Sequence, residues 1–161
     1  MENIIQAKKL TKVYGEKETS VTALDNIDVQ FNENEFTAIM GPSGSGKSTL
    51  LHCLAGLDRP TSGQILLKDQ DISTLNDKQL TKIRRDSFGF VFQAFNLIPT
   101  LTAEENITLP ASIAGRKPDM DWIKKVVETV DISDRLTHRP NELSGGQQQR
   151  VAAARAMATK P

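Results

Sequence analysis

The sequence predicts an α/β fold built around a glycine-rich loop that joins a short buried strand to a helix. Three neighbouring segments support this prediction. Residues 36–40 (Phe-Thr-Ala-Ile-Met) form an apolar run of strand length, residues 41–49 read Gly-Pro-Ser-Gly-Ser-Gly-Lys-Ser-Thr, and residues 48–55 favour a helix. The order of strand, glycine loop and helix is the setting in which such loops bind phosphate groups.

The loop matches the P-loop pattern G-x-x-x-x-G-K-[ST]. Glycine-rich backbone N–H groups form an anion-binding nest, and the N-terminus of the following helix adds its positive dipole. Lys47 is expected to reach the β- and γ-phosphates of a nucleotide, and the Ser48 hydroxyl to ligate Mg²⁺. A glycine turn that binds no nucleotide is the alternative. The predicted binding residues of the loop are Gly41, Pro42, Ser43, Gly44, Ser45, Gly46, Lys47, Ser48 and Thr49.

Length and composition allow one soluble globular domain with a sizeable core. The chain has 161 residues, and Lys+Arg and Asp+Glu both number 20, so its net charge gives no indication of a nucleic-acid partner. The single Cys53 excludes an internal disulfide, and its place between Leu51 and Leu54 predicts a buried structural thiol. His52 and His138 have no His or Cys at ligand spacing, so no structural metal site is expected.

The sequence shows no transmembrane segment and no signal peptide. No apolar run approaches the roughly 18 residues that a membrane-spanning helix needs, and the first six residues lack a basic start and an apolar core. A cytoplasmic location is expected, which is compatible with docking on a membrane protein.

The chain begins with a predicted antiparallel β-region laid against residues 36–40. Its two strands, residues 4–10 and 24–31, are rich in Ile and Val and are separated by a polar turn at residues 15–20. Tyr14 stands at the edge of that turn. An exposed aromatic ring near a nucleotide loop can stack on a purine, with simple edge packing as the alternative.

The segment after the P-loop leads to a second predicted buried strand. Its helix should end at Gly56, and a turn, a strand over residues 64–68 and a helix over residues 77–85 follow. Residues 88–92 (Phe-Gly-Phe-Val-Phe) are typical of a buried, parallel-type strand. Gln93 follows where open α/β sheets place ligands, so its amide oxygen could reach Mg²⁺ or an attacking water. A surface glutamine is the alternative.

The pattern becomes helical from residue 94 to residue 140. A capping box at residues 102–105 opens a helix toward Ile113, and residues 119–130 form an amphipathic helix after a break at residues 115–118. This region is interpreted as a helical insertion or subdomain, in which Trp122 has a packing role.

The last motif is Leu-Ser-Gly-Gly-Gln at residues 143–147, followed by an alanine-rich helix. Ser144 is a good N-cap, and the glycines leave backbone N–H groups exposed, so this is a second anion-binding helix N-terminus. A Ser-Gly-Gly cap taken alone is usually structural, but two phosphate-binding helix ends in one chain need a joint explanation.

With both motifs in view, the sequence resembles the ATP-binding subunits of ABC transporters over essentially the whole chain. Residues 143–147 are identical to the signature motif of that family, Gln93 stands where the family has its Q-loop glutamine, and Tyr14 where it has the adenine-stacking aromatic. The sequences of residues 90–102, 105–110 and 56–58 resemble those of the family branch for lipoprotein release, macrolide export and antimicrobial-peptide export.

The resemblance implies a P-loop NTPase fold of the ABC type. The expected architecture is a mixed sheet with an antiparallel β-region and a helical subdomain. The resemblance assigns residues 1–161 to an incomplete ABC ATPase domain. This domain is made of a nucleotide-binding core (1–93), a helical subdomain (94–142) and the signature motif with its helix (143–161).

The resemblance also implies a site shared between two subunits that bind ATP and Mg²⁺. Lys47 would neutralise phosphate charge, Ser48 and Gln93 would hold Mg²⁺, and Ser144 and Gly146 would close the site of a second copy. One expected partner is this second copy, with which the chain would form a homodimer. The other is a membrane permease that the helical region would touch, and no nucleic-acid partner is expected. The protein would be cytoplasmic and peripheral on the inner face of the cell membrane, and hydrolysis would drive export or extraction of lipoproteins, peptides or drugs.

One departure from the family pattern concerns the catalytic acids. The family places its Walker B aspartate, catalytic glutamate, D-loop and switch histidine beyond the position of Pro161, so no acidic residue is assigned here and the chain is expected to be a fragment lacking the C-terminal part of the core. A non-transport cytosolic ABC ATPase and a truncated module that binds nucleotide without hydrolysis are the alternatives. The transported substrate and the identity of the permease cannot be read from these residues.

Overall fold

A computed structural model describes residues 3–161 and divides the chain into two compact units. The first unit ends at Leu80 and the second begins at Thr81, so the boundary falls within helix α2 (Asp77–Ser87). Each unit has its own buried apolar residues.

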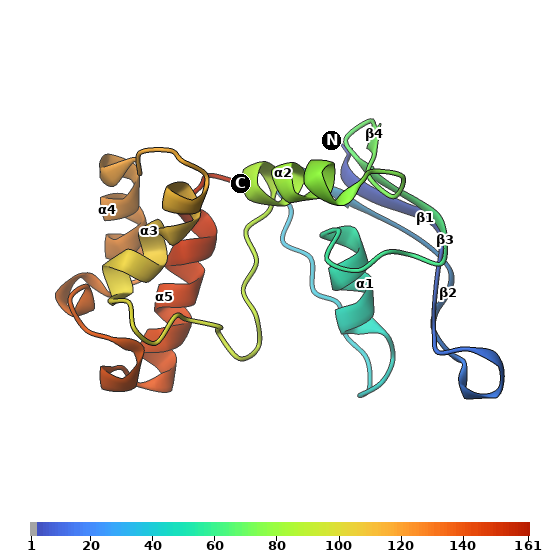
Figure 1. Cartoon of the computed structure of the whole chain (residues 1–161), viewed down its shortest axis with the longest axis horizontal. Coiled ribbons are helices and arrows are strands. Elements are labelled where there is room, and N and C mark those ends of the chain that lie inside the picture. Colours follow the sequence, from blue (N-terminus) through green and yellow to red (C-terminus); the bar gives the residue numbers. More distant parts are fainter. Residues whose placement is uncertain (1–2) are drawn as a thin grey trace. The chain divides into compact units, whose positions relative to one another are not determined.

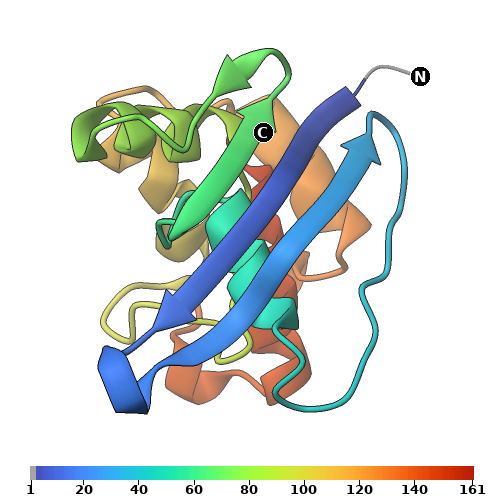
Figure 2. The same cartoon turned by 90° about the vertical axis from the view of Figure 1, so that its right-hand side faces the viewer.

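The first unit is built on an antiparallel sheet with strand order β2-β1-β3-β4 (Figure 2). The long strands β1 (Asn3–Tyr14) and β2 (Val21–Asn32) flank a short 3-10 turn, and β1 pairs on its other side with β3 (Ser62–Leu67), which continues into β4 (Gln70–Asp71). The predicted antiparallel β-region and the predicted strand at residues 64–68 are therefore confirmed, with longer first strands than expected.

Helix α1 (Lys47–Leu54) lies against one face of this sheet, where Figure 2 shows it behind the strands. Its residues Cys53 and Leu54 are buried, as are Leu10 of β1 and Ile65 of β3. The helix ends as predicted, because Gly56 takes the left-handed conformation, with φ +64°, that terminates helices.

The two predicted buried strands are not formed. Residues 36–40 and 88–92 have no strand assignment, and the side chains of Phe36 and Met40 are 99% and 88% exposed. A buried parallel strand needs neighbouring strands for its backbone N–H and C=O groups. Neither segment pairs with a strand within residues 3–161, so an apolar run of suitable length was insufficient to define a strand here.

The second unit is helical. Helices α3 (Ala103–Ile113) and α4 (Met120–Thr129) both pack against α5 (Gly145–Met157), as Figure 1 shows, and the short 3-10 turns η2 (Ser133–Arg135) and η3 (Pro140–Glu142) connect α4 to α5. The core of this unit consists of Ala103, Ile107, Ile123, Val126, Val127, Ile132, Leu143, Val151, Ala154 and Ala158.

The capping box predicted at residues 102–105 and the N-cap predicted at Ser144 are both present. Asn76 accepts a hydrogen bond from the Gln79 N–H at the start of α2, at 3.0 Å, and Thr102 and Ser144 form reciprocal capping boxes on α3 and α5. Trp122 packs against the core of the second unit, as predicted, and its indole N–H donates to the Met157 carbonyl at 2.8 Å. Among the described residues, no helix combines the length and apolar character needed to cross a membrane.

Candidate functional site

The glycine-rich loop at residues 41–46 enters α1 through two left-handed glycines. Gly44 and Gly46 have φ angles of +80° and +86°, and Gly46 is the N-cap of α1 without any side-chain hydrogen bond to the helix. A Cβ atom at Gly46 would overlap the Ala23 carbonyl oxygen of β2, so the loop is packed directly against the sheet. Because the first N–H groups of a helix have no partner within the helix, α1 presents uncapped donors at this loop.

The Lys47 ammonium group is folded back onto the loop. It donates hydrogen bonds to the carbonyl oxygens of Gly41 and Pro42 at 2.9 and 2.7 Å and to the Ser45 hydroxyl at 3.3 Å. The cation therefore lies against the loop, at the N-terminus of α1. Phosphate oxygens of a nucleotide would offer it charged acceptors in place of neutral carbonyls, and charge-assisted hydrogen bonds are the stronger ones.

The residues at this loop fit a magnesium ion carried by a nucleotide. Ser48 is exposed in the first turn of α1 and offers a hydroxyl oxygen. Residues 3–161 contain no group of three His, Cys, Asp or Glu side chains that could hold a metal. Mg²⁺ is commonly bound by one or two protein oxygens together with substrate phosphates, rather than by a cage of protein ligands.

Tyr14 belongs to a small polar cluster beside the first turn of α1. The residue is 41% exposed, and its hydroxyl donates to Asp58 Oδ2 at 2.5 Å. The hydrogen bond to Asp58 and partial burial raise the pKa of Tyr14, while a hydrogen bond with Thr49 of α1 lowers it. The ring is thus held near the P-loop helix with part of its surface accessible.

Lys12 and Asp58 hold this cluster together, and both were missed as site residues from the sequence. The Lys12 ammonium donates to Asp58 Oδ1 at 2.6 Å and lies 4.7 Å from the centroid of the Tyr14 ring. Burial opposes ionisation of the Asp58 carboxyl, but hydrogen bonds from Lys12 and Tyr14 outweigh it and lower its pKa. The only sequence signal was Gly-Leu-Asp at residues 56–58. It indicated the family branch, but it did not indicate that Asp58 contacts Lys12 and Tyr14.

Gln93 lies in the second unit, exposed, in a turn between α2 and α3. The strand that was expected to carry it is absent, so it does not stand at a strand end as predicted. Its role toward Mg²⁺ stays a prediction.

The N-terminus of α5 is open to solvent at its two glycines. Ser144 Oγ accepts from the Gln147 N–H at 3.3 Å, and Gln147 Oε1 accepts from the Ser144 N–H at 2.9 Å. A Cβ atom at Gly145 or Gly146 would meet nothing within 4 Å. The Ser144 oxygen caps the helix while its O–H remains a donor, so this end retains groups that can bind an anion.

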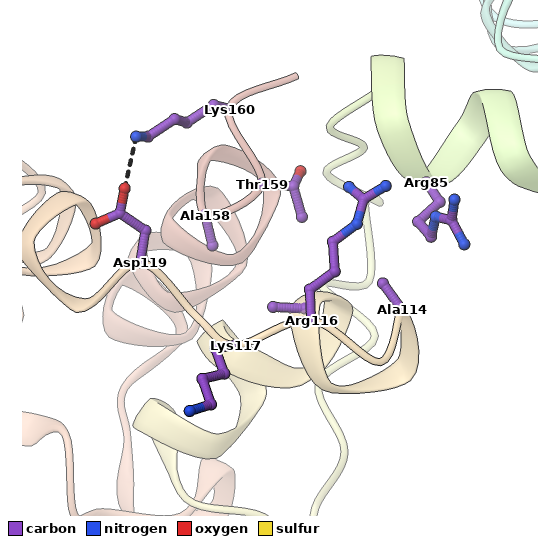
Figure 3. A pocket seen from close by; sticks show the side chains of 9 residues that line it. Arg85, Ala114, Arg116, Lys117, Asp119, Ala158, Thr159 and Lys160 are labelled. Atoms are coloured by element: carbon purple, nitrogen blue, oxygen red, sulfur yellow. Dashed lines mark hydrogen bonds and ion pairs between the residues drawn. The ribbon is translucent and has the colours of Figure 1, made fainter.

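A hollow of about 130 Å³ in the second unit is lined by several basic side chains (Figure 3). Three of them are paired with carboxylates: Arg116 with Asp86 at 3.0 Å, Arg85 with the same Asp86 at 2.8 Å, and Lys160 with Asp119 at 2.7 Å. These ion pairs neutralise much of the local charge and connect the end of the chain to the start of α4.

The sequence profile of the family described as "ABC transporter" matches residues 24–161. The chain belongs to this family. It is an ATP-binding subunit of the ABC transporter type.

This ABC protein is similar in sequence to two named relatives and to one solved structure. It is 44% identical to the lipoprotein-releasing system ATP-binding protein LolD of Cytophaga hutchinsonii, over 100% of this chain and 73% of the relative. It is 46% identical to the macrolide export ATP-binding/permease protein MacB of Marinobacter nauticus, over 96% of this chain and 24% of that longer protein. The dimeric structure of the ATP-binding cassette MJ0796 in a post-hydrolysis state with ADP and Pi has a TM-score of 0.89 and 45% identity, over 98% of this chain and 70% of that chain.

The likeness to the MJ0796 cassette confirms the predicted fold class of this ABC protein, including its antiparallel sheet and its helices. The predicted site residues fall into both units. The loop residues 41–49 and Tyr14 lie in the first unit, and Gln93, Ser144 and Gly146 lie in the second.

Proposed function

We propose that this ABC protein binds Mg-ATP at residues 41–49 and that the complete protein hydrolyses it. Lys47 would exchange its contacts with the Gly41 and Pro42 carbonyls for β- and γ-phosphate oxygens, and the uncapped N–H groups of α1 would bind the remaining phosphate charge. Ser48 and Gln93 would hold Mg²⁺, which neutralises developing charge during phosphoryl transfer. Tyr14 would stack on the adenine ring.

We further propose that two copies share each ATP. The open helix end at Ser144 and Gly146 would close the P-loop site of the second copy, because an uncompensated helix N-terminus suits a γ-phosphate. The dimeric state of the MJ0796 cassette supports this arrangement.

The same proposal places the protein on a membrane permease. Its relatives include one named for lipoprotein release and one named for macrolide export, which supports export or extraction of lipoproteins, peptides or drugs as the work that hydrolysis drives. The subunit would be cytoplasmic and peripheral on the inner face of the cell membrane, and the helical region at residues 94–142 would touch the permease.

The single observation that carries the nucleotide-binding part is the Lys47 ammonium held against the glycine-rich loop at the uncapped N-terminus of α1. Calorimetric titration with Mg-ATP tests it. Lys47→Ala should weaken binding by about 10- to 100-fold, the value of one charge-assisted hydrogen bond. The matched control is Lys78→Ala, an exposed lysine of α2 that should leave affinity unchanged. Equal affinities of the two variants would contradict the P-loop assignment.

The shared site is tested separately through Ser144→Arg in the full-length protein. The bulky side chain should block the second copy while leaving ATP binding by one subunit intact, so turnover is lost and single-subunit affinity is kept. Ser133→Arg, at an exposed position of η2, is the control. Undiminished turnover of the Ser144 variant would refute the shared site, and a wild-type protein that binds but never hydrolyses ATP would indicate a binding module instead.

A further inference from the structure

Arg155 of α5 makes an unusual pair of contacts with the loop that follows Gln93. Its Nη1 donates to the Asn96 carbonyl at 2.7 Å, and its Nη2 donates to the Phe95 carbonyl at 2.6 Å. The side chain is partly buried, and burial lowers the pKa of its guanidinium. Among the described residues no carboxylate lies within ion-pair distance of it, so this cation is held by two neutral backbone carbonyls.

The backbone that receives these hydrogen bonds is strained. Phe95 and Asn96 both adopt left-handed conformations, with φ angles of +59° and +46°. Two successive non-glycine residues in this region are unfavourable and persist only where the surroundings hold them. A guanidinium fork fits two adjacent carbonyl oxygens, whereas an ammonium group offers a single point charge.

The same loop is held at its other end by α3. Asn106 is fully buried, accepts from the Ile98 N–H at 2.7 Å, and donates to the carbonyls of Ile98, Leu101 and Thr102 at 2.9 to 3.2 Å. Residues 98–102 are therefore anchored to α3, and residues 95–96 are anchored to α5. The part of the loop next to Gln93 is therefore expected to move together with α5.

We propose that Arg155 is a positioning residue that couples the signature helix to the loop carrying Gln93. Ser144 at the N-terminus of α5 and Arg155 in its last turn are joined by a continuous helix, so a displacement of one end reaches the other. This inference rests on the proposed function, in which Ser144 engages the ATP of the second copy and Gln93 serves the metal of its own copy. Arg155 then links closure of one ATP site to the position of Gln93 in the other.

Hydrogen exchange in the full-length protein tests the clamp without any catalytic readout. Arg155→Lys keeps the positive charge and loses the fork, and it should raise amide exchange at residues 94–97 by about tenfold or more while α3 and α4 keep their protection. Arg150→Ala is the matched control, because Arg150 lies on the same helix but pairs with the exposed Asp131 at 2.9 Å. Unchanged exchange at residues 94–97 in both Arg155→Lys and Arg155→Ala would overturn the proposal.

Steady-state hydrolysis tests the coupling. Arg155→Ala should keep single-subunit ATP affinity, lower kcat by about 10- to 100-fold through misplacement of Gln93, and move the Hill coefficient for ATP toward one. Arg155→Lys should recover part of kcat, and Arg150→Ala should match the wild type. A loss that appears only in melting temperature, with kcat and the Hill coefficient unchanged, would contradict the coupling. Failure of the proposed function itself shows differently, as absent ATP binding or turnover in the wild type.

Discussion

The Cα atom of Gly46 lies so close to the Ala23 carbonyl oxygen of β2 that a Cβ atom at this position would overlap it. Gly44, two residues earlier in the same loop, is equally left-handed at φ +80°, but a Cβ atom there would have nothing within 4 Å. Gly44 is therefore required only for its backbone conformation. Gly46 is required both for its conformation and for the close approach of the loop to the sheet.

This pair predicts unequal costs for the same substitution. Gly44→Ala should lower the free energy of unfolding by about 1 kcal/mol, the cost of alanine at positive φ. Gly46→Ala should cost about 3 kcal/mol or more, because β2 or the loop must also move. Urea unfolding of both variants measures the difference, and equal costs would show that the contact with Ala23 is readily relieved.

How far the sequence predicted this structure depended on the range of the interactions involved. The caps at Thr102 and Ser144 and the helix stop at Gly56 were predicted correctly, because each depends on side-chain and backbone chemistry within a few residues. The strands at residues 36–40 and 88–92 were predicted wrongly, because a strand depends on partners that a local apolar pattern does not specify.

The candidate site divides in the same way. The P-loop could be read from a contiguous pattern whose backbone chemistry is local, and its conformation agrees with that reading. The contacts of Tyr14 with Lys12 and Asp58 could not, since Asp58 is 44 residues from Tyr14 in the chain and the two meet only after folding. The Arg155 contacts, 59 and 60 residues from their acceptors, likewise had no signal in the sequence.

The lowered pKa of Asp58 predicts a specific pH dependence of stability. A carboxyl whose pKa is lower in the folded state contributes stability above its unfolded pKa of about 3.9, and this contribution is lost as the pH falls through the folded value. The difference in unfolding free energy between wild type and Asp58→Asn should therefore be largest near neutral pH and shrink below about pH 4. The comparison isolates one carboxyl, although Asp86 and Asp119 also have lowered pKa values.

Urea titrations of both proteins at several pH values between neutral and acidic conditions make this measurement. Asp69→Asn, which removes a carboxyl at an exposed position, is the control. A wild-type advantage over Asp58→Asn that persists unchanged at low pH would mean that the ion pair with Lys12 is not its source.

Asn106 should be the most sensitive polar position of the second unit. It is 0% exposed, and its amide satisfies one backbone N–H and three backbone carbonyls. Asn106→Ala should lower the unfolding free energy by about 3 kcal/mol, since it leaves buried backbone groups without partners. Asn141→Ala, at an exposed position of η3, should change it by less than about 0.5 kcal/mol. Equal denaturation midpoints would show that water replaces the lost amide.

The Cys53 thiol should react very slowly with thiol reagents in the folded protein. It is fully buried in α1, and burial raises its pKa from 9.0 to about 11, so the reactive thiolate at pH 8 is about 100-fold scarcer than in the unfolded chain. A chromogenic disulfide reagent should therefore label the native protein at least about 100-fold more slowly than the protein in urea, because steric protection adds to the pKa effect. The reaction of glutathione with the same reagent in both solvents corrects for the solvent. A native labelling rate close to the rate in urea would show that α1 opens readily from the sheet, and Mg-ATP should then slow the reaction by holding the helix in place.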